Sequence, residues 1–184
     1  MVKPHLTTFV GGGVGRWAVD RIDAIAGAGL RYVPRLAIIE GADARLPPNA
    51  AWALRGVAGP ERYATSAEDD ALVARQESLG RPAARRGALI PITKSVQWWQ
   101  LPHQEQRAIF EESSHHIAIG MQYLPAIARR LHHGRDLGQP FDFLTWFEFA
   151  PEHEADFDEL VGRLRATEEW SYVVREVDIR VRVD

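Results

Sequence analysis

Residues 111–135 read EESSHHIAIGMQYLPAIARRLHHGR, and the expected fold is worked out from this stretch. Its apolar residues recur at intervals of three and four, which predicts a long helix with one face against a core: Ile117, Met121, Leu124, Ala128 and Leu131. Pro125 removes a backbone donor and clashes with the preceding turn, so we expect the helix to bend or break there. The break separates the adjacent histidines His115 and His116 from a basic group that begins at Arg129.

The segments around this stretch predict a mixed order of strands and helices. Residues 87–93 (GALIPIT) are typical of a buried strand, and residues 101–112 begin a helix with proline near its start. Residues 140–150 are rich in aromatic residues and predict a strand, while residues 152–166 predict an amphipathic helix. Residues 177–183 alternate apolar and charged side chains, as a half-buried strand does. This is an α+β order of the ferredoxin-like type, with helices on one face of an antiparallel sheet.

The N-terminal half gives weaker signals. Residues 5–10 predict a short strand that runs into glycines, and residues 17–25 suit a strand at least as well as a helix. Gly13, Gly15 and Ala18 imitate a dinucleotide-binding fingerprint, which we reject because no repeat of strand, helix and strand surrounds it.

Further along, residues 43–49 predict a loop and residues 51–59 a strand. Residues 66–79 predict a helix with Ser66 as its N-cap. We therefore divide the chain into residues 1–87, a truncated N-terminal ferredoxin-like half, and residues 88–184, the C-terminal half.

Composition excludes several classes of protein. The 184 residues contain no cysteine, which excludes disulfides, thiolate metal sites, iron–sulfur clusters and thioether-linked haem. A formal net charge of −3 and a pI near 6.2 argue against broad electrostatic binding to nucleic acid. No stretch approaches the roughly 18 apolar residues of a membrane span, and the N-terminus has no apolar signal segment. We expect a soluble, cytoplasmic protein that binds neither nucleic acid nor membrane.

The seven histidines raise the question of a metal site. Neighbours such as His115 and His116 project about 100° apart on a helix, so they do not readily grip one ion together. Neither H-x-x-x-H nor H-E-x-x-H is present, which makes zinc a poor fit. One axial histidine on a larger cofactor fits better. Periodicity alone leaves open that each is an ordinary core or surface histidine.

Much of the chain resembles the chlorite dismutase family, specifically its short, dimer-forming branch. The matching strings are IPITKSVQWWQL, EQRAIFEESSHHIAIGMQYLPAIARRLHHGRDLG, PFDFLTWFEFAP and TEEWSYVVREVDIR, with weaker agreement at WALRGV, ERYAT and ARQESLGR. The resemblance implies a homodimer with a dimeric α+β barrel fold, in which b-type haem lies in the C-terminal ferredoxin-like half.

The same resemblance implies roles on both sides of the haem iron. His116 becomes the axial ligand and Arg129 the distal arginine, and Glu169 accepts the other N–H of the histidine. Relatives commonly have Ser-Arg-His where this chain has Ser114-His115-His116, so a shift of one residue would select His115 instead. The register of the motif favours His116.

Further residues carry over with the motif. Lys94 and Trp98 match residues at the haem edge, where a lysine suits a propionate. Gln76 matches a distal glutamine that holds the arginine. Thr145 and Phe147 are expected to line the distal wall.

The resemblance also implies a reaction. Haem takes an oxygen atom from chlorite, and Arg129 retains the resulting hypochlorite until chloride and dioxygen form. Two alternatives remain open at this point: an enzyme like the related coproheme decarboxylase, and a haem-binding or haem-sensing protein with incidental peroxidase activity. The presence of Arg129 favours the chlorite reaction.

Overall fold

Eight antiparallel strands form one closed barrel in the computed structural model, which describes residues 5–42 and 45–184. Around the barrel the order is β1-β3-β2-β8-β5-β7-β6-β4. The strands are β1 (Leu6–Gly12), β2 (Trp17–Ala26), β3 (Arg35–Glu40), β4 (Trp52–Ala58), β5 (Arg86–Lys94), β6 (Ala128–His133), β7 (Phe143–Phe149) and β8 (Val173–Arg182). Two residues of the expected loop, 43–44, lie outside the described residues.

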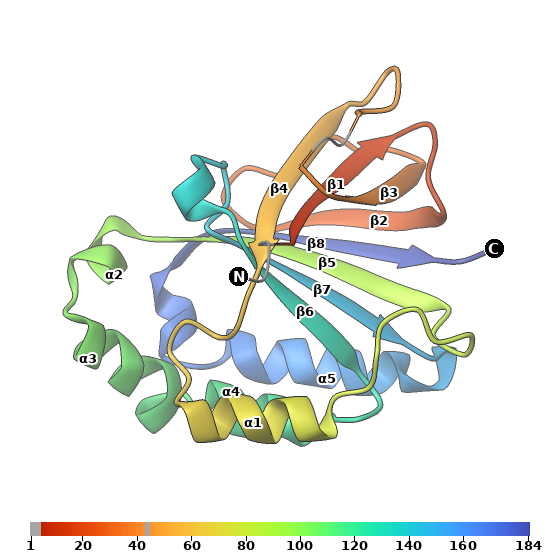
Figure 1. Ribbon diagram of the computed structural model, residues 1–184. Helices are drawn as coiled ribbons and strands as arrows, with labels where there is room; N and C mark the ends of the chain where they lie inside the picture. The colour runs from red at the N-terminus through yellow and green to blue at the C-terminus, as the bar shows by residue number, and fades with distance from the viewer. Residues whose placement is uncertain (1–4, 43–44) are drawn as a thin grey trace.

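Strands β1–β4 form one side of the barrel and strands β5–β8 the other (Figure 1). The two seams between these sides differ in length. Strands β2 and β8 pair over most of their length, whereas β4 and β6 pair at only Val57↔His133 and Ala58↔His132. The domain boundary expected after residue 87 falls inside β5, a strand that pairs with both β7 and β8.

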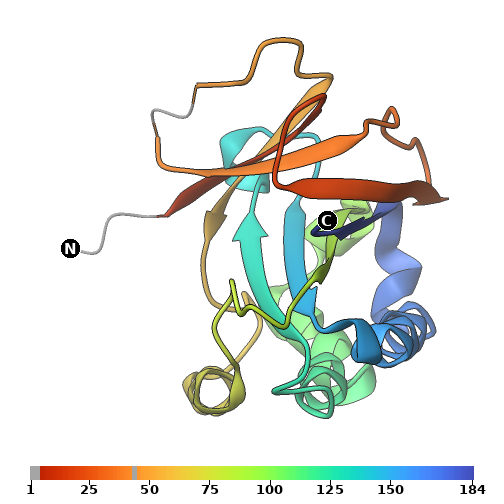
Figure 2. The same ribbon diagram turned by 90° about the vertical axis from the view of Figure 1, so that its right-hand side faces the viewer.

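Helices cover the outer face of β5–β8, opposite the arch of β1–β4 (Figures 1 and 2). They are α1 (Ser66–Arg75), α2 (Val96–Gln100), α3 (His103–Arg107), α4 (His116–Met121) and α5 (Glu154–Arg165), with a π-helical turn η1 (Ala108–Ser113) and 3₁₀ turns η2 (Arg135–Leu137), η3 (Pro151–His153) and η4 (Glu169–Tyr172). The expected amphipathic helix is confirmed, because Phe157 and Leu164 of α5 pack on Phe147 and Phe149. Within the described ranges, no helix combines the length and apolar character that a membrane crossing requires.

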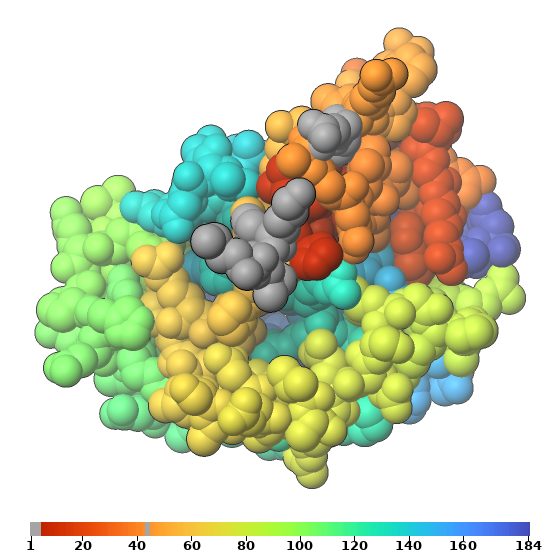
Figure 3. Space-filling view, in the orientation of Figure 1, coloured from red at the N-terminus to blue at the C-terminus, as the bar shows by residue number. Residues whose placement is uncertain are grey.

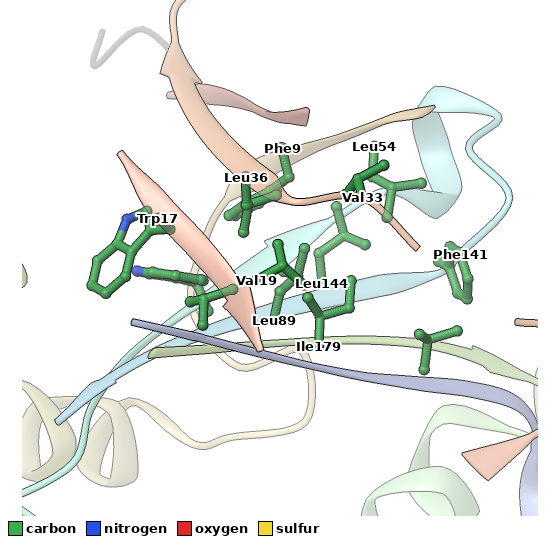
Figure 4. Packing of buried hydrophobic residues seen from close by; sticks show 13 residues of the cluster. Phe9, Trp17, Val19, Val33, Leu36, Leu54, Leu89, Phe141, Leu144 and Ile179 are labelled. Carbon is green, nitrogen blue, oxygen red and sulfur yellow. The ribbon is translucent and has the colours of Figure 1, made fainter. Parts of the chain in front are cut away.

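Alternation along each strand separates the barrel core from the helix-covered face. Leu144 and Trp146 of β7 point inward and join Phe9 and Leu89 in the core that Figure 4 shows. Their neighbours Phe143 and Phe147 pack with α5 on the outer face. Burying each large apolar side chain contributes about 1.5–3 kcal/mol, so both faces stabilise the same strands.

The structure corrects the expectation for residues 111–135. The helix α4 ends at Met121, and after Pro125 the chain continues as strand β6, not as helix. The regular three-and-four spacing therefore misassigned Ala128 and Leu131, which belong to the strand. The expected break at Pro125 is confirmed, but the second half contains one strand more than the sequence predicted.

The start and end of α1 also differ from expectation. Thr65, not Ser66, is the N-cap: its hydroxyl accepts the N–H of Glu68, and the Glu68 carboxylate accepts the N–H of Thr65 at 2.7 Å. This capping box fixes the helix one residue earlier than predicted. The helix ends at Arg75 with Gln76 as its C-cap, so it does not extend to Leu79.

The rejection of a dinucleotide-binding fold is confirmed. The glycines at residues 11–13 lead into strand β2, which pairs antiparallel with β3 and β8, and not into a helix. A fingerprint of this kind requires a helix N-terminus for the pyrophosphate, and β2 provides none.

The buried His132 makes the stability of the barrel pH-dependent. The side chain is 1% exposed, its Nδ1–H donates to the Leu144 carbonyl at 3.2 Å, and its Nε2 has no hydrogen-bond partner among the described residues. Burial lowers the pKa of His132 from 6.5 to about 4. Between these values the unfolded chain binds a proton that the folded chain does not, so stability is fully present above pH 6.5 and falls as the pH drops towards 4.

We therefore predict that up to about 3 kcal/mol of unfolding free energy is lost through His132 across this range. The His132→Asn variant should be less stable at neutral pH but should lack this share of the pH slope. Urea denaturation at several pH values measures the difference. His5→Asn, which changes an exposed histidine, serves as the control. Parallel slopes for wild type and His132→Asn would contradict the prediction.

Candidate active site

A pocket lies between the outer face of β5–β7 and the elements that cover it. One wall of the pocket consists of residues paired across two strands: Arg129 of β6 is opposite Phe147 of β7, and Leu131 is opposite Thr145. All four of these side chains line the pocket, and Val161 and Leu164 of α5 close it from outside. In the space-filling view of Figure 3, the molecule is hollowed between the yellow segment that carries α1 and the strands above it.

His116 is the histidine that reaches this pocket. It begins α4, directly after His115, which has a left-handed backbone with φ 55° and ψ 37° and an exposed side chain. The His116 ring stacks on Phe110 at 4.4 Å between centroids. Its Nδ1 lies 2.7 Å from Oε2 of Glu169. Because the carboxylate takes this nitrogen, Nε2 is the atom that remains for a metal.

Glu169 joins His116 to Lys94 in a buried chain of charged groups. The Lys94 Nζ lies 2.5 Å from the other carboxylate oxygen of Glu169, and both residues are less than 5% exposed. Burial alone would raise the pKa of Glu169, but His116 and Lys94 together lower it to about 2. Burial lowers the pKa of Lys94, and the charge of Glu169 opposes this. Glu169 therefore stays ionised and orients the histidine ring.

Lys94 and Trp98, both expected at a haem edge, contact each other beside Glu169. Lys94 lines the pocket, and its ammonium contacts Glu169 and lies 3.5 Å from the centroid of the Trp98 ring. Trp98 is fully buried behind the lysine and does not line the pocket. A buried ammonium takes the nearest carboxylate because an unpaired charge is costly there. Lys94 therefore supports Glu169 directly, and Trp98 packs against Lys94.

Tyr63 is a pocket residue to which the sequence analysis gave no role. Its hydroxyl accepts a hydrogen bond from Trp98 Nε1 at 2.9 Å, and burial raises the pKa of Tyr63 to about 12. The ERYAT string was the available signal, since Tyr63 lies in its centre.

Arg129, on strand β6, also lines the pocket. Its guanidinium lies 3.1 Å from the carboxylate of Glu61, and both side chains are 12% exposed. Glu61 lies in the segment between β4 and α1; it begins the same ERYAT string as Tyr63, and the sequence analysis gave it no role either. The pocket thus brings together His116, Glu169 and Arg129, which are spread over 54 residues of sequence.

The structure does not bring Gln76 to the pocket. As the C-cap of α1 it is exposed, and it is not among the lining residues. A different polar group lies near the site: Arg165 donates two hydrogen bonds to Glu176, which also accepts from Trp170 Nε1 at 2.8 Å. In the part of the chain that the structure describes, no cluster of three or more His, Asp or Glu side chains could hold a bare metal ion.

Comparison with known proteins agrees with this geometry. A family model described as Chlorite dismutase matches residues 49–182. The chain belongs to the chlorite dismutase family. Among solved structures, a dimeric chlorite dismutase from Nitrobacter winogradskyi is 52% identical, with 97% of this chain and 99% of that chain covered and a TM-score of 0.88.

Chlorite dismutases of lower identity share the fold. The enzyme from Candidatus Nitrospira defluvii in complex with imidazole is 19% identical, with 100% of this chain and 93% of that chain covered and a TM-score of 0.68. As a member of the chlorite dismutase family, this chain is an enzyme.

The buried carboxylate provides a test of the site architecture. Glu169→Ala leaves the Lys94 ammonium buried without its partner, so we expect a loss of about 3–5 kcal/mol in unfolding free energy. The adjacent Glu168 is exposed, and Glu168→Ala should cost less than about 1 kcal/mol. Urea denaturation compares the two variants. Equal losses would mean that the buried contacts of Glu169 with Lys94 and His116 add nothing to the free energy of unfolding.

Proposed function

We propose that this enzyme holds b-type haem and decomposes chlorite to chloride and dioxygen. The supporting observation is that His116, with Nε2 available and Nδ1 held by a buried carboxylate, lines the same pocket as Arg129. Arg129 comes thirteen positions after His116 in sequence, and the turn at Pro125 returns the chain to the pocket. Family membership adds support, since a 52% identical relative is a chlorite dismutase.

The residues of the pocket fit a haem. An imidazole whose Nδ1–H is donated to a carboxylate is the arrangement of a metal-ligating histidine, so His116 would hold the iron. Side chains such as Ile90, Phe147 and Leu164 form an apolar wall that suits a macrocycle. We propose that the cofactor lies here, in the C-terminal half of a ferredoxin-like, dimeric α+β barrel.

The chemistry divides between cofactor and protein. Haem, held by His116, would supply oxygen-atom-transfer chemistry at its iron. Glu169 keeps its negative charge and accepts the Nδ1–H of His116, which makes Nε2 a stronger donor. The guanidinium of Arg129 is always charged, so it can attract chlorite and retain hypochlorite. Chlorite becomes chloride and dioxygen without net gain or loss of protons, so no general base is required.

The distal wall would keep water away from this step. Phe147 is buried, and Thr145 is the neighbouring polar group on the same face of β7. An anion is retained more strongly where water does not compete for the donors of Arg129.

The first test separates the two adjacent histidines. We expect His116→Ala to abolish most of the haem absorption spectrum of the reconstituted protein, because the axial nitrogen is lost. His115→Ala should leave it nearly intact, since that side chain is exposed and outside the pocket. Absorption titration with haem measures both. The reverse result would place the ligand one residue earlier.

The second test concerns Arg129. We expect Arg129→Ala to keep its haem spectrum, to evolve oxygen from chlorite roughly 10- to 1,000-fold more slowly, and to release more hypochlorite. An oxygen electrode used beside a hypochlorite trap measures both effects. Equal rates and equal release would remove Arg129 from the mechanism. If wild type evolves no oxygen, the decarboxylase or haem-sensing alternative takes precedence.

The third test concerns assembly. We propose a homodimer, because the 52% identical relative is a dimeric chlorite dismutase. Light scattering should give about twice the 20.7 kDa of one chain. A mass of one chain, or of five, would contradict the proposal.

A further inference from the structure

Glu61 is a negatively charged residue inside the pocket that has no part in the reaction described above. Its carboxylate lies 3.1 Å from the guanidinium of Arg129, and both side chains are 12% exposed. A paired arginine of this kind is already neutralised before any anion arrives. Glu61 is therefore placed to compete with an anionic ligand for the same guanidinium.

The segment that carries Glu61 is firmly anchored. Two residues further on, the Tyr63 hydroxyl is bonded to Trp98, and the Tyr63 carbonyl accepts a hydrogen bond from Arg107 at 2.6 Å. Arg107 in turn makes two hydrogen bonds of 2.7 Å to Glu68 of α1. These bonds restrict the loop that follows Glu61, and the Glu61 carboxylate itself is held by its contact with Arg129.

The other side of the Arg129 guanidinium faces helix α4. A Cβ atom at Gly120 would lie 3.6 Å from Nη1 of Arg129, so the arginine lies directly against this glycine. Gly120 is four residues after His116 and therefore lies on the same face of the helix. Arg129 is thus held between Glu61 and the helix face that carries His116.

We propose that Glu61 is a positioning residue that holds Arg129 and weakens the binding of small anions at this site. The inference rests on the proposed function, in which Arg129 receives an anion. The guanidinium has five donors, so it can keep its bond to Glu61 and still offer donors to a small anion. The carboxylate lowers the net positive charge that the anion meets, which also allows chloride to leave.

The geometry sets the size of the effect. The negative charge of Glu61 repels an anion bound to Arg129 over several ångströms, and in a partly buried pocket this repulsion weakens anion binding substantially. When the charge is removed, hydration of the freed guanidinium offsets part of the gain in affinity. We expect Glu61→Gln, which removes the charge and keeps the shape, to tighten anion binding about tenfold.

The experiment is a titration of the ferric, haem-loaded protein with fluoride, followed in the absorption spectrum. Glu61→Gln should lower the fluoride Kd about tenfold, whereas Glu61→Asp, which keeps the charge, should stay within about threefold of wild type. Glu40→Gln is the matched control, because Glu40 pairs with the neighbouring Arg130 at the same 3.1 Å but on the exposed, opposite face of β6. It removes the same charge from the protein and should leave the Kd unchanged.

A double-mutant cycle tests whether the effect passes through Arg129. In the Arg129→Ala background, Glu61→Gln should change the fluoride Kd by less than about twofold. An equal tightening there would mean that Glu61 acts by its charge alone and would overturn the positioning role. An unchanged Kd in the single variant would overturn the inference altogether.

The result does not depend on chlorite turnover. If wild type evolves no oxygen but the fluoride cycle behaves as expected, the proposed reaction fails while the role of Glu61 stands. A second measurement needs no haem: urea denaturation of the same four proteins should give non-additive losses for Glu61→Gln and Arg129→Ala, because the two share one ion pair. Additive losses of unfolding free energy would count against an ion pair between Glu61 and Arg129.

Discussion

The site depends on one buried carboxylate. Glu169 is 1% exposed and is bonded to both Lys94 and His116, so it ties η4 to β5 and α4 at a single point. Taking such charges out of water is costly, and close mutual contact offsets the cost only when the geometry is good. The backbone N–H of Glu169 also donates to Ser114 Oγ at 2.9 Å, which fixes the turn just before the histidine. The chain of contacts leaves the imidazole one orientation.

Charge balance is the second property of the pocket. Three cations in its lining have carboxylate partners: Lys94 has Glu169, Arg129 has Glu61, and Arg165 has Glu176. Each pair lies against a mainly apolar wall, where the local dielectric constant is low and electrostatic effects are large. An anion that binds to Arg129 must therefore share its guanidinium with Glu61.

Sequence patterns predicted most of the helices and strands, and the family resemblance selected His116 and Arg129, which line one pocket. The C-terminal strand and the helix α5 were predicted because their apolar residues alternate or recur cleanly. Strand β6 was missed because Arg129 and Leu131 on one face alternate with Arg130 and His132 on the other, so neither face has an apolar pattern.

Other features lay beyond any local pattern. Closure of the barrel joins Val57 to His133 and Ile22 to Ile179, pairings that no nearby residue encodes. The choice of His116 over His115 came from the register of a family motif, and the structure places His116 in the pocket. Glu61 and Tyr63 were overlooked because loop residues have no periodicity. The position of Gln76 depended on where α1 ends, and Gln76 is its C-cap.

The alternation of β6 and β7 also limits how this protein can change during evolution. One set of residues fills the barrel and the interleaved set lines the pocket, so a single inserted or deleted residue would exchange the two sets. Such a change in β6 would turn Arg129 towards the barrel core. The same change in β7 would turn Trp146 towards the pocket. Lineages can vary the connecting loops in length, but these two strands must keep their length while their side chains diverge.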